Sequence, residues 1–431
     1  MEMETLTHPS ESSSNSPAAA AAASPSWVML KRYNNNNDDD DGDSSSVITG
    51  DATKTAAICR TTTGWLIRDK PNDDERYVEG PLVVAAHDGV VLLRLRVPRD
   101  RRGACTDAFE RRRPAAGAVP PPRLLHLHAA RCTSARHLRA EDTGVMRRRR
   151  GEDDDEVLVA QLEVALDAPR DTAELCVLRR RLPDCEWDLK RIPIVHNDGA
   201  SNVDALMRPW KTDAVVTAGD RFMCWVDYYG GVLLCDMADP TNKLVYLPLP
   251  VEADQDTAEE RRSSDRPDLR SYRTLAGAGA NALRFVSVDG CCCGGGAVSE
   301  SKCARSRFTF MVTTWTMSLE AAAAAGDAPI MSTWVKDGVF DCDELWALSN
   351  YGSLPRVPVE HPVVSSDDPD AVCFLLINDY RGCGNIDRRE DERLWTVMVN
   401  TRSKTLLSVL PQDPMLSGDP LVPAKLSIHY S

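Results

Sequence analysis

The sequence predicts an all-β protein whose strands form antiparallel meanders, arranged like the blades of a β-propeller. In residues 221–251, three short apolar runs are separated by Tyr-Gly-Gly and by Asp-Pro-Thr-Asn. Turn-forming clusters between short apolar runs are typical of antiparallel strands. Helical periodicity is scarce, since only residues 318–325 have a helix-forming composition, which stops at Gly326. Many short strands with frequent turn signals indicate a sandwich, a barrel or a propeller.

A faint internal repeat favours the propeller among these architectures. Residues 394–411 resemble residues 231–250. In each segment an apolar strand ends in Asp or Asn, and a polar turn, a lysine and a second apolar strand ending in Pro follow. Paired strands that recur about every 40–50 residues are typical of propeller blades. The chain of 431 residues has room for six or more such units, and the number of blades stays open.

The N-terminal half alternates polar tracts with strands. Residues 1–26 are low in complexity, which predicts a disordered tail, and the Asn/Asp-rich tract 34–46 predicts a loop between 27–33 and 58–67. His-Asp-Gly between the apolar runs 82–86 and 90–97 indicates a hairpin, because Asp-Gly supplies the positive φ angles of a tight turn. Residues 99–123, rich in Arg, Ala and Pro, are expected to form a long surface loop. Further strands are expected over 157–164, 173–180 and 186–194.

The C-terminal half continues with a strand over 214–217 and the meander over 221–251, followed by a charged loop over 252–271. Strands are expected over 283–288 and 308–319, and Asp337-Gly338 at the centre of 334–340 predicts a small hairpin. The last strands are expected over 372–378, 394–400 and 405–410. We divide the chain into an N-terminal β region over 27–210 and a C-terminal β region over 211–431, which are expected to form one continuous structure.

The composition indicates an intracellular protein, in the cytoplasm or the nucleus. No apolar run approaches the roughly 20 residues that cross a bilayer, and the N-terminus lacks the basic and apolar parts of a signal peptide. The net charge of −14 opposes non-specific binding to phosphate or anionic lipid. We therefore expect no membrane contact.

No metal or cofactor is expected. The fourteen cysteines contain no Cys-x-x-Cys pair, and those in apolar runs, such as Cys224, are expected to be reduced and structural. The Cys-Cys-Cys-Gly-Gly-Gly run at 291–296 is interpreted as a flexible insertion, and His126 and His128 as a strand-edge pair. The Ala/Gly-rich segment 276–282 lacks the third glycine of a dinucleotide fingerprint.

The stretch from Arg94 to Arg150 is the strongest electrostatic feature. It contains sixteen arginines and five acidic residues, a formal charge of +11 within an acidic chain. Such a cluster could bind phosphates or nucleic acid. However, acidic residues at 152–156 follow the last four arginines, and only Phe109 offers a ring for base stacking. We prefer a solvated loop neutralised by its neighbours, and nucleic acid is not the expected partner.

Asp227 and Asp236 are the candidate catalytic residues if the protein is an enzyme. Both stand at strand ends, where the central cleft of a propeller often opens. A glycosidase needs two carboxylates about 5–10 Å apart. The preferred interpretation is that both accept backbone N–H bonds in turns. Nucleophile-elbow, phosphate-loop and zinc-protease motifs do not occur.

Residues 225–250, WVDYYGGVLLCDM…LVYLPLP, resemble the signature of a plant family known as domain of unknown function 1618. The wider resemblance extends upstream to 83–98 and 174–194 and downstream to 282–290 and 343–365. The family signature itself is placed at about 221–365. It implies no catalytic residues and no cofactor. The strand-and-turn style also resembles the β-propeller domains that follow F-boxes in plant adaptors, although the chain lacks a recognisable F-box.

These observations favour a non-enzymatic scaffold that binds a protein partner through loops at one end of its blades, since loops on a rigid frame carry most recognition. One alternative is a carbohydrate-active hydrolase that uses Asp227 and Asp236 in a central cleft. A second alternative is a nucleic-acid-associated protein that uses the stretch from Arg94 to Arg150.

Overall fold

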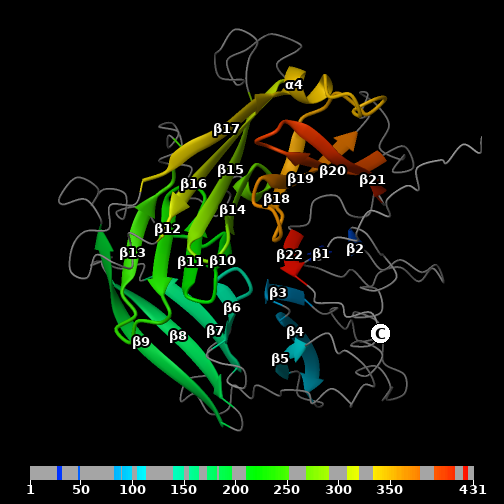
Figure 1. The fold of residues 1–431 in the computed structure, drawn as a ribbon. Coiled ribbons are helices and arrows are strands. Elements are labelled where there is room, and N and C mark those ends of the chain that lie inside the picture. The colour runs from blue at the N-terminus through cyan, green and yellow to red at the C-terminus, as the bar shows by residue number, and fades with distance from the viewer. Residues whose placement is uncertain are drawn as a thin grey trace, which may run out of the picture.

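The computed structural model describes residues 27–31, 47–48, 82–88, 90–99, 104–112, 139–149, 155–164, 172–181, 184–196, 210–251, 268–290, 308–319, 333–378, 393–412 and 421–425. Nearly all regular structure in these residues is β (Figure 1). The described helices are the 3-10 helix η4 (Leu269–Ser271) and the α-helix α4 (Cys342–Trp346). The all-β prediction is confirmed. The expected tail 1–26, the tract 34–46, the histidine pair at 126 and 128, and the cysteine run at 291–293 lie outside the described residues.

The described strands form five hydrogen-bonded sheets, in which all but one strand pair are antiparallel. One three-stranded sheet has the order β2 (Val47–Ile48), β1 (Trp27–Lys31), β22 (Leu421–Lys425), and the other contains β3 (Leu82–His87), β4 (Val90–Arg99) and β5 (Ala104–Arg112). One four-stranded sheet contains β14 (Arg273–Gly277), β15 (Ala282–Gly290), β16 (Phe310–Ser318) and β17 (Val335–Asp341). A second contains β18 (Val359–Val364), β19 (Ala371–Asn378), β20 (Arg393–Asn400) and β21 (Thr405–Gln412).

The eight-stranded sheet consists of two meanders joined edge to edge. The first contains β6 (Thr143–Arg149), β7 (Asp155–Val164), β8 (Thr172–Arg181) and β9 (Asp184–His196), and the second contains β10 (Ala214–Ala218), β11 (Phe222–Asp227), β12 (Gly231–Asp236) and β13 (Leu244–Pro248). β13 pairs in parallel with β9, and the opposite edge strands β6 and β10 also contact each other. The sheet is therefore nearly closed and barrel-like.

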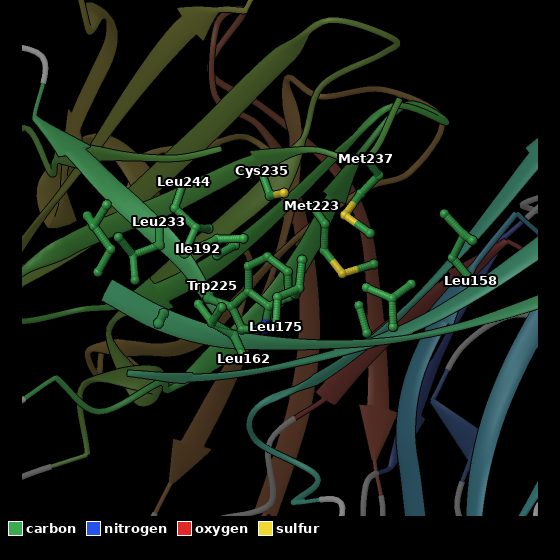
Figure 2. Packing of buried hydrophobic residues seen from close by; sticks show 14 of the residues in the cluster. Leu158, Leu162, Leu175, Ile192, Met223, Trp225, Leu233, Cys235, Met237 and Leu244 are labelled. Atoms are coloured by element: carbon green, nitrogen blue, oxygen red, sulfur yellow. The ribbon is translucent and has the colours of Figure 1, made fainter. Parts of the chain in front are cut away.

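A buried apolar cluster fills the space that this sheet encloses. Trp225 lies at its centre, surrounded by side chains that include Leu162, Leu175 and Leu233 (Figure 2). The indole nitrogen of Trp225 donates a hydrogen bond to the carbonyl oxygen of Asp142 at 2.9 Å. A large ring thus fills the wedge between two meanders while its polar edge is satisfied.

Similar apolar clusters lie between the following sheets. Phe222 and Cys224 of the second meander pack in one cluster with Phe285 and Trp315 of the sheet β14–β17. A further cluster joins that sheet to β18–β21 and includes an edge-to-face pair between Phe340 and Phe374, with ring centroids 6.4 Å apart. Consecutive sheets thus pack against each other face to face.

Six strands, one at an edge of each strand group, contact one another in a closed order, and we call them the first strands: β3, β6, β10, β14, β18 and β22. β3 contacts β6, β6 contacts β10, β10 contacts β14 and β14 contacts β18, while β22 contacts both β18 and β3. In Figure 1 these six strands stand around the middle of the molecule, with β13, β17 and β21 toward its outside. Because β1 pairs with β22, the first and last described strands of the chain share one sheet. Six strand groups thus follow one another around a common centre.

Small residues allow the first strands to approach closely around this centre. A Cβ atom added at Gly277 would lie 2.3 Å from the carbonyl oxygen of Thr217. At Gly219, where φ is +58°, it would lie 2.3 Å from the carbonyl oxygen of Ala280. Only glycine meets both the steric and the backbone requirement at position 219.

The repeat seen in the sequence has a structural counterpart. Residues 231–250 supply β12 and β13, and residues 394–411 supply most of β20 and β21, which are the third and fourth strands of their meanders. Asp236 accepts a hydrogen bond from the N–H of Ala238 at 2.9 Å, and Asn400 accepts one from the N–H of Arg402 at 3.1 Å. The Asp or Asn that ends the third strand therefore has the same turn-forming role in both units.

The prediction of a small hairpin around Asp337-Gly338 is wrong. β17 is one strand, paired along β16 with a register irregularity between Thr314 and Trp315. Asp337 accepts hydrogen bonds from side chains of the sheet, including Thr314 at 2.9 Å, so it does not close a turn. A Cβ atom at Gly338 would lie 2.5 Å from the hydroxyl oxygen of Thr314, which explains the glycine by close packing.

The expected loop over 99–123 is wrong for residues 104–112, which form β5. This strand pairs with β4 in continuous register, from Arg99 opposite Ala104 to Val91 opposite Arg112. The composition rich in Arg and Ala concealed it, because a neighbouring strand can override weak local β propensity.

Candidate ligand-binding cavity

A cavity of about 540 Å³ lies at the centre of the sheets. Most of its lining residues come from five of the six first strands and the turns that flank them: β3, β6, β10, β14 and β18. Tyr228 comes from the turn between β11 and β12. Ligand cavities in proteins usually enclose about 300–1,000 Å³. The cavity is therefore large enough for a small organic molecule or for an inserted side chain.

The wall between the two ends of the cavity is mainly apolar. Small and β-branched residues dominate it, among them Val84, Val145, Val215, Leu275 and Val363. Polar groups gather where the first strands begin and end. This distribution, an apolar middle with polar and charged groups at both ends, suits an organic ligand that carries a polar group.

Arg147 and Arg149 form the basic part of one end of the cavity, beside the turn that follows β3. The carboxylate of Asp88 lies 2.8 Å from Nη2 of Arg149 and 3.8 Å from Nη1 of Arg147. Nη1 of Arg147 also donates a hydrogen bond to the carbonyl oxygen of Asp88 at 3.1 Å. Asp88 has a φ of +40°, as expected for the first residue of an Asp-Gly turn. Two guanidinium groups thus converge on one carboxylate.

His87 links three first strands at the same end. Its Nδ1 accepts the backbone N–H of Arg147 on β6 at 3.0 Å, and the ring also interacts with the backbone of Gly219 after β10. Burial lowers the pKa of His87, and the nearby carboxylates of Asp88 and Asp220 only partly oppose this effect. The neutral imidazole is therefore the form that fits its position.

Tyr228 organises the other end of the cavity. Its N–H donates to the carboxylate of Asp213 at 2.9 Å, and its carbonyl oxygen accepts from Nη1 of Arg273 at 2.7 Å. The hydroxyl oxygen accepts the backbone N–H of Leu275 on β14 at 3.2 Å. Burial raises the pKa of Tyr228 to about 12, so that the phenol stays protonated near neutral pH. Arg270 and His361 also line this end.

The structure does not bring the two carboxylates predicted from the sequence together. Asp227 faces Gly231 at one end of the β11–β12 hairpin, and Asp236 faces Phe222 at the other end. Five residues of extended strand separate them, which corresponds to about 17 Å. Neither residue lines the cavity. This separation exceeds the spacing of a glycosidase pair.

Both carboxylates take part in local structure. Asp227 accepts the N–H of Tyr229 at 3.0 Å through Oδ1. Asp236 accepts the N–H of Ala238 at 2.9 Å through Oδ1, and its Oδ2 binds Nε and Nη2 of Arg221 at 2.9 and 2.6 Å. These contacts are those of turn residues and of a surface ion pair.

The described arginines at the end of the Arg94–Arg150 stretch belong to β6, where each has an acidic neighbour. Arg147 and Arg149 lie beside Asp88, and Arg148 contacts the buried carboxylate of Glu156 at 3.5 Å. Local neutralisation of this part of the stretch agrees with the preferred interpretation of its charge. The expectation of a solvated loop is wrong here, because these arginines stand on a strand and Arg148 lies against a buried carboxylate.

Three further features concern the described residues alone. Among them, no group of three or more His, Cys, Asp and Glu side chains could hold a metal ion. Five cysteines of this part of the chain are buried, and they are Cys176, Cys224, Cys235, Cys342 and Cys373. None of the helices in this part of the chain has the length and apolar character needed to cross a membrane.

The fold and the site define an all-β protein with consecutive sheets around one central cavity. Residues 225–373 match the family described as "Protein of unknown function (DUF1618)". The match begins at Trp225, within the signature expected over about 221–365, and ends within β19. No curated protein matches the chain.

Sequence reasoning missed the residues that line the cavity, although a signal for them exists. Three first strands end in a run of small residues next to a Gly turn: Ala-Ala-His-Asp-Gly at 85–89, Thr-Ala-Gly-Asp at 217–220 and Ala-Gly-Ala-Gly at 276–279. Such runs are required where first strands crowd around a centre, as the close approach at Gly277 shows.

Proposed function

We propose that the protein is a non-catalytic scaffold of the β-propeller type, with six blades, that binds a protein partner at one end of its central cavity. The closed order of contacts among the first strands carries the proposal. The pairing of the first and last described strands within one sheet also supports it, because propellers place such sheets radially around a channel.

The end of the cavity near His87 supplies the surface for this partner. Turns from different sheets gather there, since His87 interacts with the backbone of Gly219, and Gly219 touches Ala280. Asp220 and Ala280 line the cavity and are exposed. Exposed turns held by a rigid frame are where binding residues usually stand.

The contacts of the candidate residues favour a scaffold over the two alternatives. The hydrolase alternative requires paired carboxylates, whereas Asp227 and Asp236 stand at opposite ends of a hairpin. The nucleic-acid alternative requires basic groups that face outward without partners, whereas Arg148 contacts buried Glu156.

Affinity purification of the tagged full-length chain tests the proposal when it compares two matched double variants. Asp220→Arg/Ala280→Arg changes the exposed end of the cavity, and Leu189→Arg/Val195→Arg changes exposed positions on β9. We expect the first variant to lose a stable protein partner that the wild type and the second variant retain. A chain that has no stable protein partner but binds a glycan would contradict the proposal, as would equal retention by all three proteins.

A further inference from the structure

We propose that the central cavity binds a small organic carboxylate, with the carboxylate group at Arg147 and Arg149 and the apolar body between the first strands. This inference goes beyond the scaffold, because it assigns a small-molecule site inside the ring of sheets. It rests on the geometry of the arginine pair, on the nature of the cavity wall and on the balance of lining charges.

The arginine pair already holds one carboxylate, that of Asp88. Nη2 of Arg149 contacts it at 2.8 Å, whereas Nη1 of Arg147 is 3.8 Å away, beyond hydrogen-bond distance. A guanidinium group has five N–H donors in a planar fork that matches a carboxylate. The carboxylate of Asp88 therefore occupies the arginine pair, and a ligand carboxylate would replace it there or bind the two arginines together with it.

The surroundings of Arg147 strengthen its interaction with an anion. Its side chain is 18% exposed, whereas that of Arg149 is 60% exposed, and the wall beside it contains Val84 and Val145. A charge near an apolar wall is screened less than one in open solvent, so a ligand carboxylate there is held more strongly. Arg147 is accordingly the main anchor, and Arg149 assists it at the solvent side.

The lining residues select an anion over a cation. Four arginines line the cavity, against three aspartates; they are Arg147, Arg149, Arg270 and Arg273, and Asp88, Asp213 and Asp220. Two of these carboxylates are already engaged, Asp88 by Arg149 and Asp213 by the N–H of Tyr228. The lone pair of His87 Nδ1 is used by the N–H of Arg147. Of the arginines, Arg270 is bound by Asp268 at 2.6 Å and Arg273 donates to the carbonyl oxygen of Tyr228. The donors that a ligand carboxylate meets are therefore those of Arg147 and Arg149.

The apolar wall determines the rest of the ligand. Aliphatic side chains of β6, β10, β14 and β18, among them Val145, Val215 and Leu275, line a cavity of about 540 Å³. Burial of a hydrocarbon body there contributes roughly 25 cal/mol per Å² of apolar surface removed from water. An aryl- or alkyl-substituted acid fits this combination better than a small inorganic anion.

Titration calorimetry on the full-length chain tests the proposal with three probes of one shape: 3-phenylpropanoate, 3-phenylpropanamide and 3-phenylpropylamine. We expect the acid to bind saturably and at least about tenfold more tightly than the amide, as a charge-assisted hydrogen bond implies. The amine is expected not to bind. Equal affinity for acid and amide, or no saturable binding of the acid at millimolar concentration, would overturn the proposal.

Two variants of opposite expected effect separate binding from folding. Arg147→Gln should weaken acid binding about tenfold, whereas Asp88→Asn should tighten it, because Asn tolerates the same backbone conformation and no longer competes for the arginines. Arg191→Gln, on an exposed arginine of β9, is the matched control and should change nothing. If Arg147→Gln does not fold, tighter binding of the acid by Asp88→Asn still supports the assignment of the site. Unchanged or weaker acid binding by Asp88→Asn would reject the assignment.

Discussion

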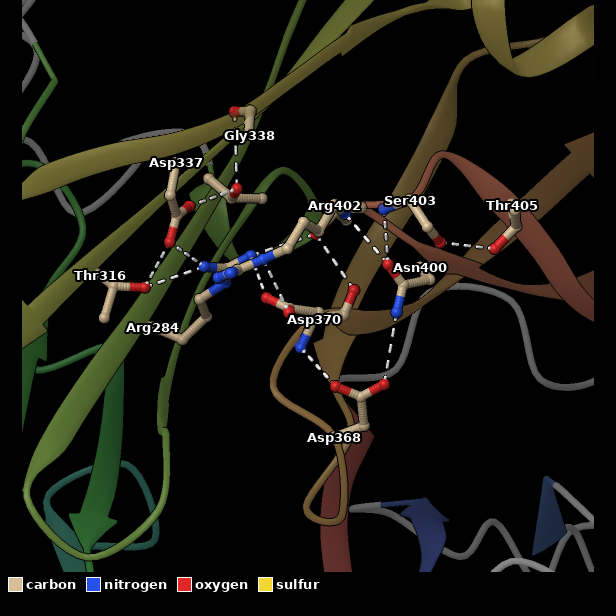
Figure 3. Close-up of polar contacts among 12 residues, drawn as sticks. Arg284, Thr316, Asp337, Gly338, Asp368, Asp370, Asn400, Arg402, Ser403 and Thr405 are labelled. Atoms are coloured by element: carbon tan, nitrogen blue, oxygen red, sulfur yellow. Dashed lines mark hydrogen bonds and ion pairs between the residues drawn. The ribbon is translucent and has the colours of Figure 1, made fainter.

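Arg284 joins two neighbouring sheets, and its replacement by methionine should weaken that junction. The side chain rises from β15, is only 2% exposed and lies between carboxylates of two sheets (Figure 3). Nη1 donates to Asp337 of β17 and to Thr316 at 2.8 Å. Nη2 donates to the hydroxyl oxygen of Thr401 at 3.1 Å and lies 3.2 Å from Asp370, residues of the turns that directly follow β20 and precede β19.

The expected loss follows from what each carboxylate retains. Removing one partner of a buried ion pair costs about 3–5 kcal/mol. Asp337 keeps the hydroxyl donors of Thr314 and Thr316, at 2.9 and 2.6 Å, and Asp370 keeps Arg402 at 2.9 Å. We therefore expect Arg284→Met to lower the free energy of unfolding by an amount near the lower limit, about 3 kcal/mol.

Urea denaturation followed by tryptophan fluorescence measures this loss. Arg402→Met is the matched control, because that side chain is 66% exposed and an exposed ion pair contributes at most about 1 kcal/mol. Arg284→Met/Asp337→Asn should recover part of the loss, since the buried carboxylate is then neutral. A loss for Arg284→Met no larger than that for Arg402→Met would refute the role of Arg284 between the sheets.

Three further changes test residues around the cavity. Burial lowers the pKa of His87 from its usual value of 6.5, so just below that pH the unfolded chain binds more protons than the folded chain, and stability should fall as pH decreases below 6.5. The urea midpoint of His87→Gln should fall less steeply with decreasing pH than that of the wild type. Identical pH slopes for the two proteins would argue against this role. Gly219→Ala should lower the free energy of unfolding by at least about 1–2 kcal/mol, because φ is positive and the added Cβ meets the carbonyl oxygen of Ala280. An unchanged thermal unfolding midpoint would contradict the close approach of Gly219 to Ala280. Tyr228→Phe should cost about 1–3 kcal/mol, since the buried N–H of Leu275 loses its acceptor, and faster amide exchange at Leu275 is the specific readout.

Local pattern was sufficient to predict most strands of the C-terminal half, but β14, β18 and β22 were not predicted and β17 was expected to be a hairpin. The meander over 221–251 became β11, β12 and β13, because alternating apolar residues and turn clusters are properties of short segments. The hairpin around Asp88 was predictable for the same reason, and its φ of +40° is that of the expected turn.

The cavity could not be predicted from local pattern, because it depends on contacts between residues far apart in sequence. His87 was visible only as a turn residue, and Arg147 only as part of a charged stretch. Their contact joins β3 to β6 across sixty residues. Arg284 was similarly hidden, since nothing in the run Leu-Arg-Phe-Val indicates partners in another sheet. β5 was missed because its pairing, not its composition, determines its structure.

The most direct test of the closed order of the sheets is a disulfide between the first and last described strands, β1 and β22. Val28 of β1 lies opposite Ala424 of β22 in antiparallel register. Opposite residues in such pairs have Cα atoms about 4.5–5.5 Å apart, which suits a disulfide. In Val28→Cys/Ala424→Cys, peptide mapping should find the 28–424 disulfide in the folded protein, and its formation should raise the unfolding midpoint, because the bond closes a loop of nearly the whole chain. A native protein in which both introduced thiols stay reduced under oxidising conditions would contradict the closed order of the sheets.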